Sequence, residues 1–147
     1  MANNVFVLDD GTKEIVCNNS FGEEIGRFHI RGGDLSILDR YNSLLADFEK
    51  IIEPLKTVKL QDDGTSSFDD DWKVVKEVEA TFIQRLNDIF GTKDIGNLFK
   101  DRNAFSTIGG EFYAEKVVDM LGKVVASEMA EETRKAEARF AKYKKEK

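Results

Sequence analysis

The sequence has few of the residues from which enzyme and metal sites are usually built. Its 147 residues include one cysteine, one histidine and one proline. A lone cysteine excludes an internal disulfide framework and a cysteine metal cage, and a lone histidine excludes zinc sites built on histidine pairs. Apolar runs stay well short of the roughly 18 residues of a membrane span, and no basic-then-apolar leader opens the chain. We therefore expect a cytoplasmic protein with no metal, no cofactor and no membrane partner.

The composition is that of a soluble globular domain with an uneven charge. Apolar residues make up 41% of the chain and charged residues 34%, which is typical of a folded domain rather than a disordered one. The length suits one domain over residues 1–147. The net charge is −6, but residues 134–147 carry seven Lys or Arg against two Glu, so the preceding 133 residues carry −11. An acidic body argues against general nucleic-acid binding.

A strand followed by a long helix forms the stretch around which the chain is organised. Apolar and polar residues alternate over residues 25–31, which predicts a strand with one buried face. Gly32 and Gly33 end the strand, and Asp34 follows where a helix N-cap is expected. Apolar residues then recur at three- and four-residue steps until Pro54, the pattern of a core-packing helix.

Residues 1–31 are expected to form a three-stranded antiparallel meander. Residues 5–8 form an apolar run, Asp10-Gly11 is a strong hairpin-turn signal, and residues 13–17 form the returning strand. A second turn leads into the strand described above. A sheet this small needs a covering layer, and the helix that follows it is the expected cover.

The remainder of the chain is expected to be helical. A second helix is predicted over about residues 70–90, a short third helix near Asp94, and a last helix from about Gly110 to the C-terminus. If Gly122 does not break it, the last helix spans about 50 Å. A compact domain of this size is only about 38 Å across, so the end of the helix should project.

These elements predict an α+β fold that is mostly helical. The meander should pack on a bundle of three to four helices, and the long C-terminal helix should complete the bundle. Residues 34–125 would form the helical body and residues 126–147 a projecting charged tail.

The candidates for chemistry have structural interpretations that we favour. His29 has no arguable orienting partner or nucleophile, so it is interpreted as a strand histidine on the polar face. Cys17 has no nearby positive field and is interpreted as an inert, partly buried thiol. The acidic loop at residues 61–70 fails the EF-hand spacing about Gly64, which favours helix capping. The Gly-Gly pairs fit no phosphate-binding pattern and indicate turns, so no catalytic residue is assigned.

Three aromatic residues are candidate partner-binding residues: Phe105, Phe140 and Tyr143. Most of the eleven phenylalanines are readily placed in a core, but these three rings fit there less well. Phe140 and Tyr143 lie three residues apart among Arg and Lys on the otherwise polar tail, which is the composition of an interface anchor. An incidental solvated tail is the alternative. Trp72 is expected at the edge of the core.

The stretch FHIRGGDLSILDRYNSLL, preceded by a small hairpin, resembles the opening of a family of phage proteins. These are the tail assembly chaperone-like proteins of long-tailed phages and prophages of Gram-positive bacteria. The similarity is best over residues 1–55. Beyond Pro54, only the acidic helices and the charged helical end match in character.

The resemblance implies a non-enzymatic protein of the host cytoplasm. Such chaperones coat the long tape-measure protein and recruit tail-tube subunits during assembly, and they are absent from the finished virion. The expected partners are therefore the tape-measure protein and the tail-tube protein, and the chain itself is a possible homo-oligomer. The alternative is a structural tail or tail-completion protein that is retained in the virion. No functional residue carries over from the family.

Overall fold

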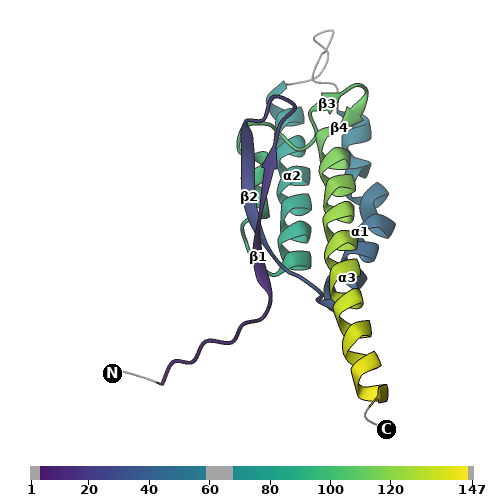
Figure 1. Cartoon of the computed structure of the whole chain (residues 1–147). Coiled ribbons are helices and arrows are strands. Elements are labelled where there is room, and N and C mark those ends of the chain that lie inside the picture. The colour runs from purple at the N-terminus through teal and green to yellow at the C-terminus, as the bar shows by residue number, and fades with distance from the viewer. Residues whose placement is uncertain (1–3, 59–67, 146–147) are drawn as a thin grey trace.

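The computed structural model describes residues 4–58 and 68–145, with side chains through Tyr143. In order, the elements are β1 (Thr12–Asn18), β2 (Glu24–Arg31), α1 (Leu35–Ile52), η1 (Glu53–Thr57), α2 (Phe68–Phe90), η2 (Ile95–Phe99), β3 (Thr107–Ile108), β4 (Glu111–Phe112) and α3 (Tyr113–Lys145). Figure 1 shows the three long helices running side by side, with the β1–β2 hairpin against one side of them. The N-terminal segment and the end of α3 leave the body at the same end (Figure 1).

The predicted three-stranded meander is wrong, because its first strand does not form. Among the described residues, the sheet holds β1 and β2 only, paired antiparallel with Ile15 opposite Phe28. Residues 5–8 lie outside the sheet in no regular element, and their side chains are 84–96% exposed. The turn that would fold them back onto β1 is replaced by two local hydrogen bonds. Asp9 accepts from the backbone N–H of Gly11 (3.1 Å), and Asp10 accepts from that of Thr12 (3.0 Å).

The second edge of β2 is covered by side chains rather than by a third strand. Asp94 accepts from the backbone N–H of His29 (3.1 Å), and Thr92 donates to the carbonyl of the same residue (2.8 Å). Asn97 donates to the carbonyl of Arg27 (2.9 Å). Because these bonds satisfy both backbone groups of His29 and the carbonyl of Arg27, the segment at residues 92–97 takes the place of a neighbouring strand there.

Helix α1 begins and ends where its sequence signals predict. Asp34 is the N-cap, and its Oδ1 accepts from the backbone N–H of Ser36 (2.9 Å). Gly33 precedes it with φ of +79°, a conformation that costs glycine little. At the other end α1 gives way at Glu53 to η1, which holds Pro54 in its first turn.

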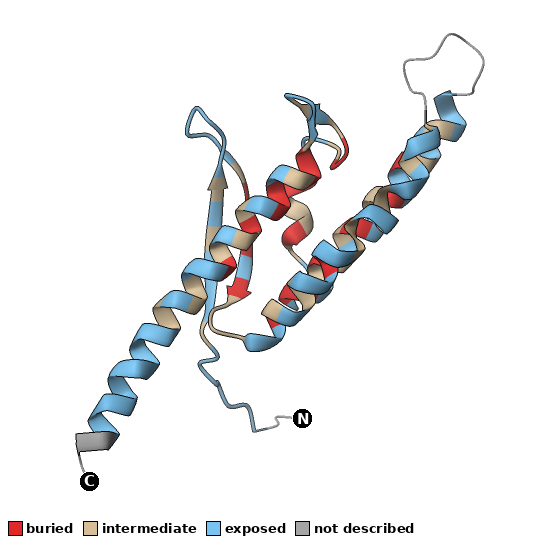
Figure 2. Ribbon diagram, turned by 90° about the vertical axis from the view of Figure 1, so that its right-hand side faces the viewer, coloured by how far each residue is buried: buried red, intermediate tan, exposed pale blue. Residues whose placement is uncertain are grey.

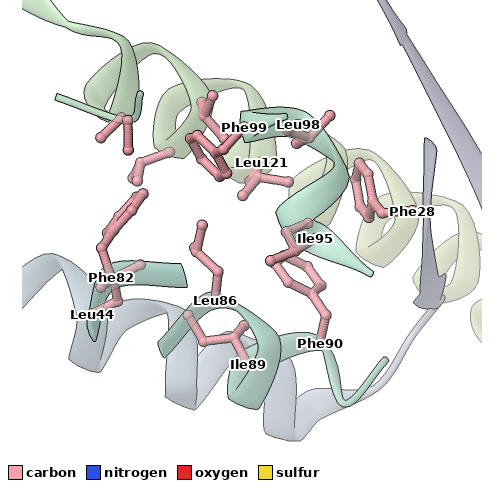
Figure 3. Packing of buried hydrophobic residues seen from close by; sticks show 14 of the residues in the cluster. Phe28, Leu44, Phe82, Leu86, Ile89, Phe90, Ile95, Leu98, Phe99 and Leu121 are labelled. Carbon is pink, nitrogen blue, oxygen red and sulfur yellow. The ribbon is translucent and has the colours of Figure 1, made fainter. Parts of the chain in front are cut away.

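One hydrophobic core joins the hairpin to all three long helices. Phe82 of α2 lies fully buried within it, in edge-to-face contact with Phe48, Phe99 and Phe105 at centroid distances of 5.7–5.9 Å. Such edge-on ring contacts add to the free energy of burial. Figure 3 shows side chains from α2, η2, β2 and α3 converging on this interior; the labelled residues are Phe28, Leu44, Phe82, Leu86, Ile89, Phe90, Ile95, Leu98, Phe99 and Leu121.

The predicted helix over about residues 70–90 is present as α2, and the short helix predicted near Asp94 is the 3-10 helix η2. The turn predicted at Gly109 and Gly110 belongs to a small hairpin that was not predicted. Strands β3 and β4 pair through a turn at Gly109 and Gly110, which both have positive φ. Helix α3 starts directly after β4 and continues through Gly122 to Lys145 without a break.

Candidate partner-binding surface

Helix α3 changes character along its length. Its first half belongs to the core; the buried residues are Tyr113, Ala114, Val117, Val118, Leu121 and Val125. From Thr133 to Tyr143 every side chain is exposed. Figure 2 shows this change as red and tan bands giving way to continuous pale blue where the helix leaves the body. At about 1.5 Å per residue, the 33 residues of α3 extend for about 50 Å, so the projecting end predicted from the sequence is observed.

Close contacts on α1 fix the buried half of α3. Tyr41 of α1 donates from its hydroxyl to the carbonyl of Val118 (2.9 Å). The ring of Tyr41 lies against Gly122, where a Cβ would collide with its hydroxyl. Burial raises the pKa of Tyr41, so the hydroxyl stays protonated and able to donate near neutral pH. Gly122 therefore provides the notch into which α1 packs, instead of breaking the helix.

A second set of contacts holds α3 where it leaves the body. Lys13 of β1 forms an ion pair with Glu128 (2.8 Å), which raises the pKa of the lysine. Side chains of Glu128 and Glu132 lie against Gly32 and Gly33, at positions where a Cβ on either glycine would collide with them. The glycine pair thus serves both as the turn predicted from the sequence and as the close approach between the sheet and α3.

The exposed half of α3 carries a line of residues on one face, which we call the α3 seam. Its members are spaced alternately four and three residues apart; they are Met129, Thr133, Ala136, Phe140 and Tyr143. This is the spacing of the contact positions in a coiled coil. Phe140 is 65% exposed and Tyr143 is 49% exposed. Such large rings on a solvent-facing helix are typical of residues that a partner covers.

Arg139 holds one of the two rings in place. Its guanidinium lies 5.7 Å from the centroid of the Tyr143 ring and donates to the hydroxyl of that residue (2.6 Å). Because the tyrosine ring is fixed by this cation–π contact, less side-chain entropy is lost when a partner covers it.

Ion pairs within the exposed half stabilise the helix where it has no core contacts. Glu131 pairs with Arg134 (3.1 Å) and with Lys135 (3.6 Å), the latter at the predicted i,i+4 spacing. The hydrogen bond from Arg134 lowers the pKa of Glu131. Beyond these pairs the sequence is rich in Lys and Arg, so the end of α3 presents a positive surface.

The structure separates the three predicted partner-binding residues. Phe140 and Tyr143 share the exposed seam. Phe105 is only 8% exposed, and its ring packs edge-on against Phe82 and Phe112. We correct that assignment: its ring belongs to the core and is left out of the partner-binding surface.

His29 has carboxylate partners that sequence reasoning did not find. Its Nδ1 lies 2.6 Å from Asp94, and its Nε2 lies 3.9 Å from Glu14. Desolvation raises the pKa of Asp94, but hydrogen bonds from His29 and Thr92 outweigh it, and the net pKa is lowered. The Thr92 hydroxyl donates to Asp94 and to a backbone carbonyl, so this cluster fastens β2 to η2.

Cys17 matches its interpretation as a partly buried thiol. Burial raises its pKa, which lowers the thiolate fraction at neutral pH. Within the described ranges, no group of three or more His, Cys, Asp or Glu side chains could hold a metal ion. The EF-hand alternative at residues 61–70 falls mostly on residues 59–67, which lie outside the described residues. No helix in the described part of the chain is long and apolar enough to cross a bilayer.

Two exposed apolar features were not predicted as surface. Phe68 and Trp72, at the start of α2, stack with an interplanar angle of 9°, and both are exposed. The second feature is the segment at residues 5–8, which had been assigned to a strand. The i,i+4 spacing of Phe68 and Trp72 was a signal that could have identified the first pair.

Comparison with known proteins gives no relative for this chain: no family model, curated protein or solved structure matches it.

Proposed function

We propose that this protein is a phage tail assembly chaperone, which binds the tape-measure protein or tail-tube subunits in the host cytoplasm through the α3 seam. It acts as a non-enzymatic binding protein. The observation that carries the proposal is the exposed half of α3. Its helix is anchored by the buried first half, and it presents Phe140 and Tyr143 to solvent. The resemblance of residues 1–55 to such chaperones supplies the choice of partner.

The seam suits a helical partner. Its alternating four- and three-residue spacing lets a second helix lie along it with side chains interdigitated. Recognition of an amphipathic helix in this way depends on a few anchors, here the two aromatic rings. The tape-measure protein is very long, and its helical segments need cover until the tail tube closes around them.

The composition of the seam favours reversible binding. Apart from Met129, which packs against the core, only Phe140 and Tyr143 are large, and the positions between them and the body are Thr133 and Ala136. A contact with two anchors and small residues elsewhere buries less apolar area than a permanent interface does. A chaperone must leave before the virion is complete, so weak anchoring agrees with that role.

The positive charge of the projecting end indicates what charge the partner segment should carry. Residues 134–147 carry a net charge of +5 on a chain whose remainder is acidic. Opposite charges steer association and suppress wrong partners. We therefore expect the bound segment to be an acidic amphipathic helix, and we expect its affinity to fall as salt concentration rises.

Co-purification tests the proposal. The tagged full chain is expressed with the tape-measure protein encoded in the same gene cluster, and separately with the tail-tube protein. Recovery of either partner supports the proposal. If recovery is lost when Phe140 and Tyr143 are changed to alanine, the α3 seam is the binding surface. The matched control is Phe68→Ala with Trp72→Ala, which removes the other exposed aromatic pair. Recovery of neither partner by the unchanged chain would refute the proposal.

A structural tail or tail-completion protein retained in the virion remains the second candidate. The exposed apolar segment at residues 5–8 favours it, because permanent assemblies bury such segments between subunits. Mass spectrometry of purified virions separates the two functions: a chaperone is absent, whereas a structural protein is present at a fixed copy number. Gene position gives an independent indication, since a chaperone gene should lie between the tail-tube and tape-measure genes.

A further inference from the structure

Residues 5–8 form an exposed apolar segment that belongs to no strand. All four side chains are apolar and 84–96% exposed: Val5, Phe6, Val7 and Leu8. Single exposed apolar residues are ordinary, but a continuous run of four on a polar protein marks an interaction site. Val and Phe favour strands, and Figure 1 shows the segment running out from the body.

The segment is directed away from its own sheet. Asp9 and Asp10 accept hydrogen bonds from the backbone N–H groups of Gly11 and Thr12, and Gly11 in turn accepts from the N–H of Gly32 (3.3 Å). A tight Asp-Gly hairpin turn would need positive φ at both central residues, and in the described part of the chain only glycines have positive φ. The local bonds therefore hold residues 9–11 in a shape that does not return the segment to β1.

Strand β1 has an open edge. Arg27 and His29 direct their backbone groups away from β1, toward the segment at residues 92–97. Their opposite residues, Val16 and Glu14, therefore direct their own N–H and C=O groups to the far edge of β1. The described residues provide no partner for those groups. An unpaired strand edge of this kind is a template for another strand.

The usual protection of an open edge is weak here. A lysine on an edge strand normally repels an incoming strand, but Lys13 is tied to Glu128 of α3 at 2.8 Å. Glu14 is likewise paired with Arg27 across the outer face of the hairpin (2.9 Å). Both charges are thus neutralised within the chain, and the edge is left open to an apolar strand.

A pocket beside the end of β1 fits an aromatic ring. It has a volume of about 150 Å³ and lies between Cys17 and Ile25 of the hairpin and Val117 and Met120 of α3. A cavity of about that size accommodates benzene when its lining is apolar, and here Asn18 and Lys116 add a polar side to a mostly apolar lining. Phe6 is the one aromatic ring in the exposed segment.

We propose that residues 5–8 of one copy add as a strand to the open edge of β1 in a second copy, with Phe6 entering the pocket beside Cys17. The two elements belong to the same chain and cannot meet within it in the observed conformation. If each copy adds its residues 5–8 to the β1 edge of the other, both apolar segments are covered and both strand edges are paired. The result is a closed two-fold dimer. The exchange uses no residue of the α3 seam, so it does not depend on the proposed chaperone role.

Disulfide trapping tests the contact directly. Four variants each replace one of residues 5–8 by cysteine and retain the native Cys17, and each is oxidised at micromolar concentration. At least one variant should form a disulfide to Cys17 of the other copy, seen as a band of twice the mass and mapped by peptide mass spectrometry. The same variants carrying Cys17→Ser should lose that band. A disulfide to Cys17 within one chain, or none to Cys17 in any variant, would overturn the proposal.

The oligomeric state gives a second test, with a matched control. Sedimentation should show a concentration-dependent dimer, and Phe6→Asp should raise its dissociation constant at least tenfold. Phe21→Asp changes an equally exposed phenylalanine in the β1–β2 turn and should alter the constant less than twofold. Val16→Pro removes one donor from the open edge alone and should weaken the dimer while the melting temperature confirms the fold. A monomer at all concentrations, or equal effects of the two aspartate variants, would contradict the exchange.

Discussion

The two halves of α3 share one backbone but are held by different forces. The first half buries Val117, Leu121 and Val125 against the rest of the body. Tyr41 of α1 packs against it at Gly122 and donates a hydrogen bond to its backbone. In the second half, as far as Tyr143, the half-buried Met129 is the only apolar side chain that packs against the core. There the helix rests on residues of high intrinsic helix propensity and on ion pairs within the helix.

This difference shows how one element can serve two purposes. A helix whose stability comes from packing cannot offer its packed face to a partner. A helix continued by propensity alone keeps its whole surface available, but it is only marginally stable by itself. The buried half therefore supplies a nucleus for the exposed half, and stability and binding should respond to different substitutions.

Leu121→Ala should have the largest effect on stability. Leu121 is fully buried, so its truncation should lower the free energy of unfolding by about 2–5 kcal/mol. Urea unfolding monitored by circular dichroism measures the loss. If the loss were below about 1 kcal/mol, the first half of α3 would not be the packed half and the comparison would fail.

Asp94→Ala should have the next largest effect, and the effect should depend on pH. The change leaves the N–H of His29 without its acceptor, which costs about 1–2 kcal/mol at neutral pH. Because the pKa of Asp94 is lowered in the folded state, its contribution is present above the ordinary value of 3.8 and is lost as the pH falls through the folded pKa. The variant and the original chain should therefore differ in their free energy of unfolding at neutral pH. That difference should disappear at acid pH. A difference independent of pH would contradict the assigned role of the carboxylate.

Gly122→Ala should have a smaller effect on stability, and this effect tests the contact between Gly122 and Tyr41 of α1. The added methyl group collides with the Tyr41 hydroxyl, and the cost exceeds the gain in helix propensity by about 1 kcal/mol. Tyr41→Phe removes the colliding atom, so it should cost less in the Gly122→Ala background than in the original chain. Additive effects in this double-mutant cycle would show that the two residues do not pack together.

Changing Phe140 and Tyr143 to alanine should have the smallest effect on stability. Both rings are exposed, and substitutions at such positions stay within about 0.5 kcal/mol each. Thermal unfolding measures the change. A loss as large as that of Leu121→Ala would place the rings in a core and remove the contrast between the halves.

The elements predicted correctly from the sequence are those specified by local signals. Asp34 caps α1, Pro54 closes it, and the three- to four-residue spacing of apolar residues gives α2 and the start of α3. Each signal acts over a few residues, so it can be read without knowledge of the fold.

The errors arose where one local signal allows two conformations, or where distant residues decide the outcome. The Asp10-Gly11 pair is a hairpin signal, but here the aspartates bond to the following N–H groups instead. The partners of β2 at residues 92–97 lie more than 60 residues away along the chain. Phe105 follows no helical period, so its burial against Phe82 depends on contacts that only the folded chain reveals. The Phe140–Tyr143 pair was identifiable, because the polar residues around it predict exposure.

Under the proposed function, the exposed half of α3 binds a partner that the body does not need for folding. The most direct measurement is a binding isotherm of the full chain with fluorescently labelled fragments that tile its proposed partner, the tape-measure protein. We expect saturable binding to at least one helical fragment. Changing Phe140 and Tyr143 to alanine should weaken that binding at least tenfold, and changing Phe68 and Trp72 to alanine should weaken it less than twofold. No binding to any fragment, or equal weakening by the two pairs, would contradict it.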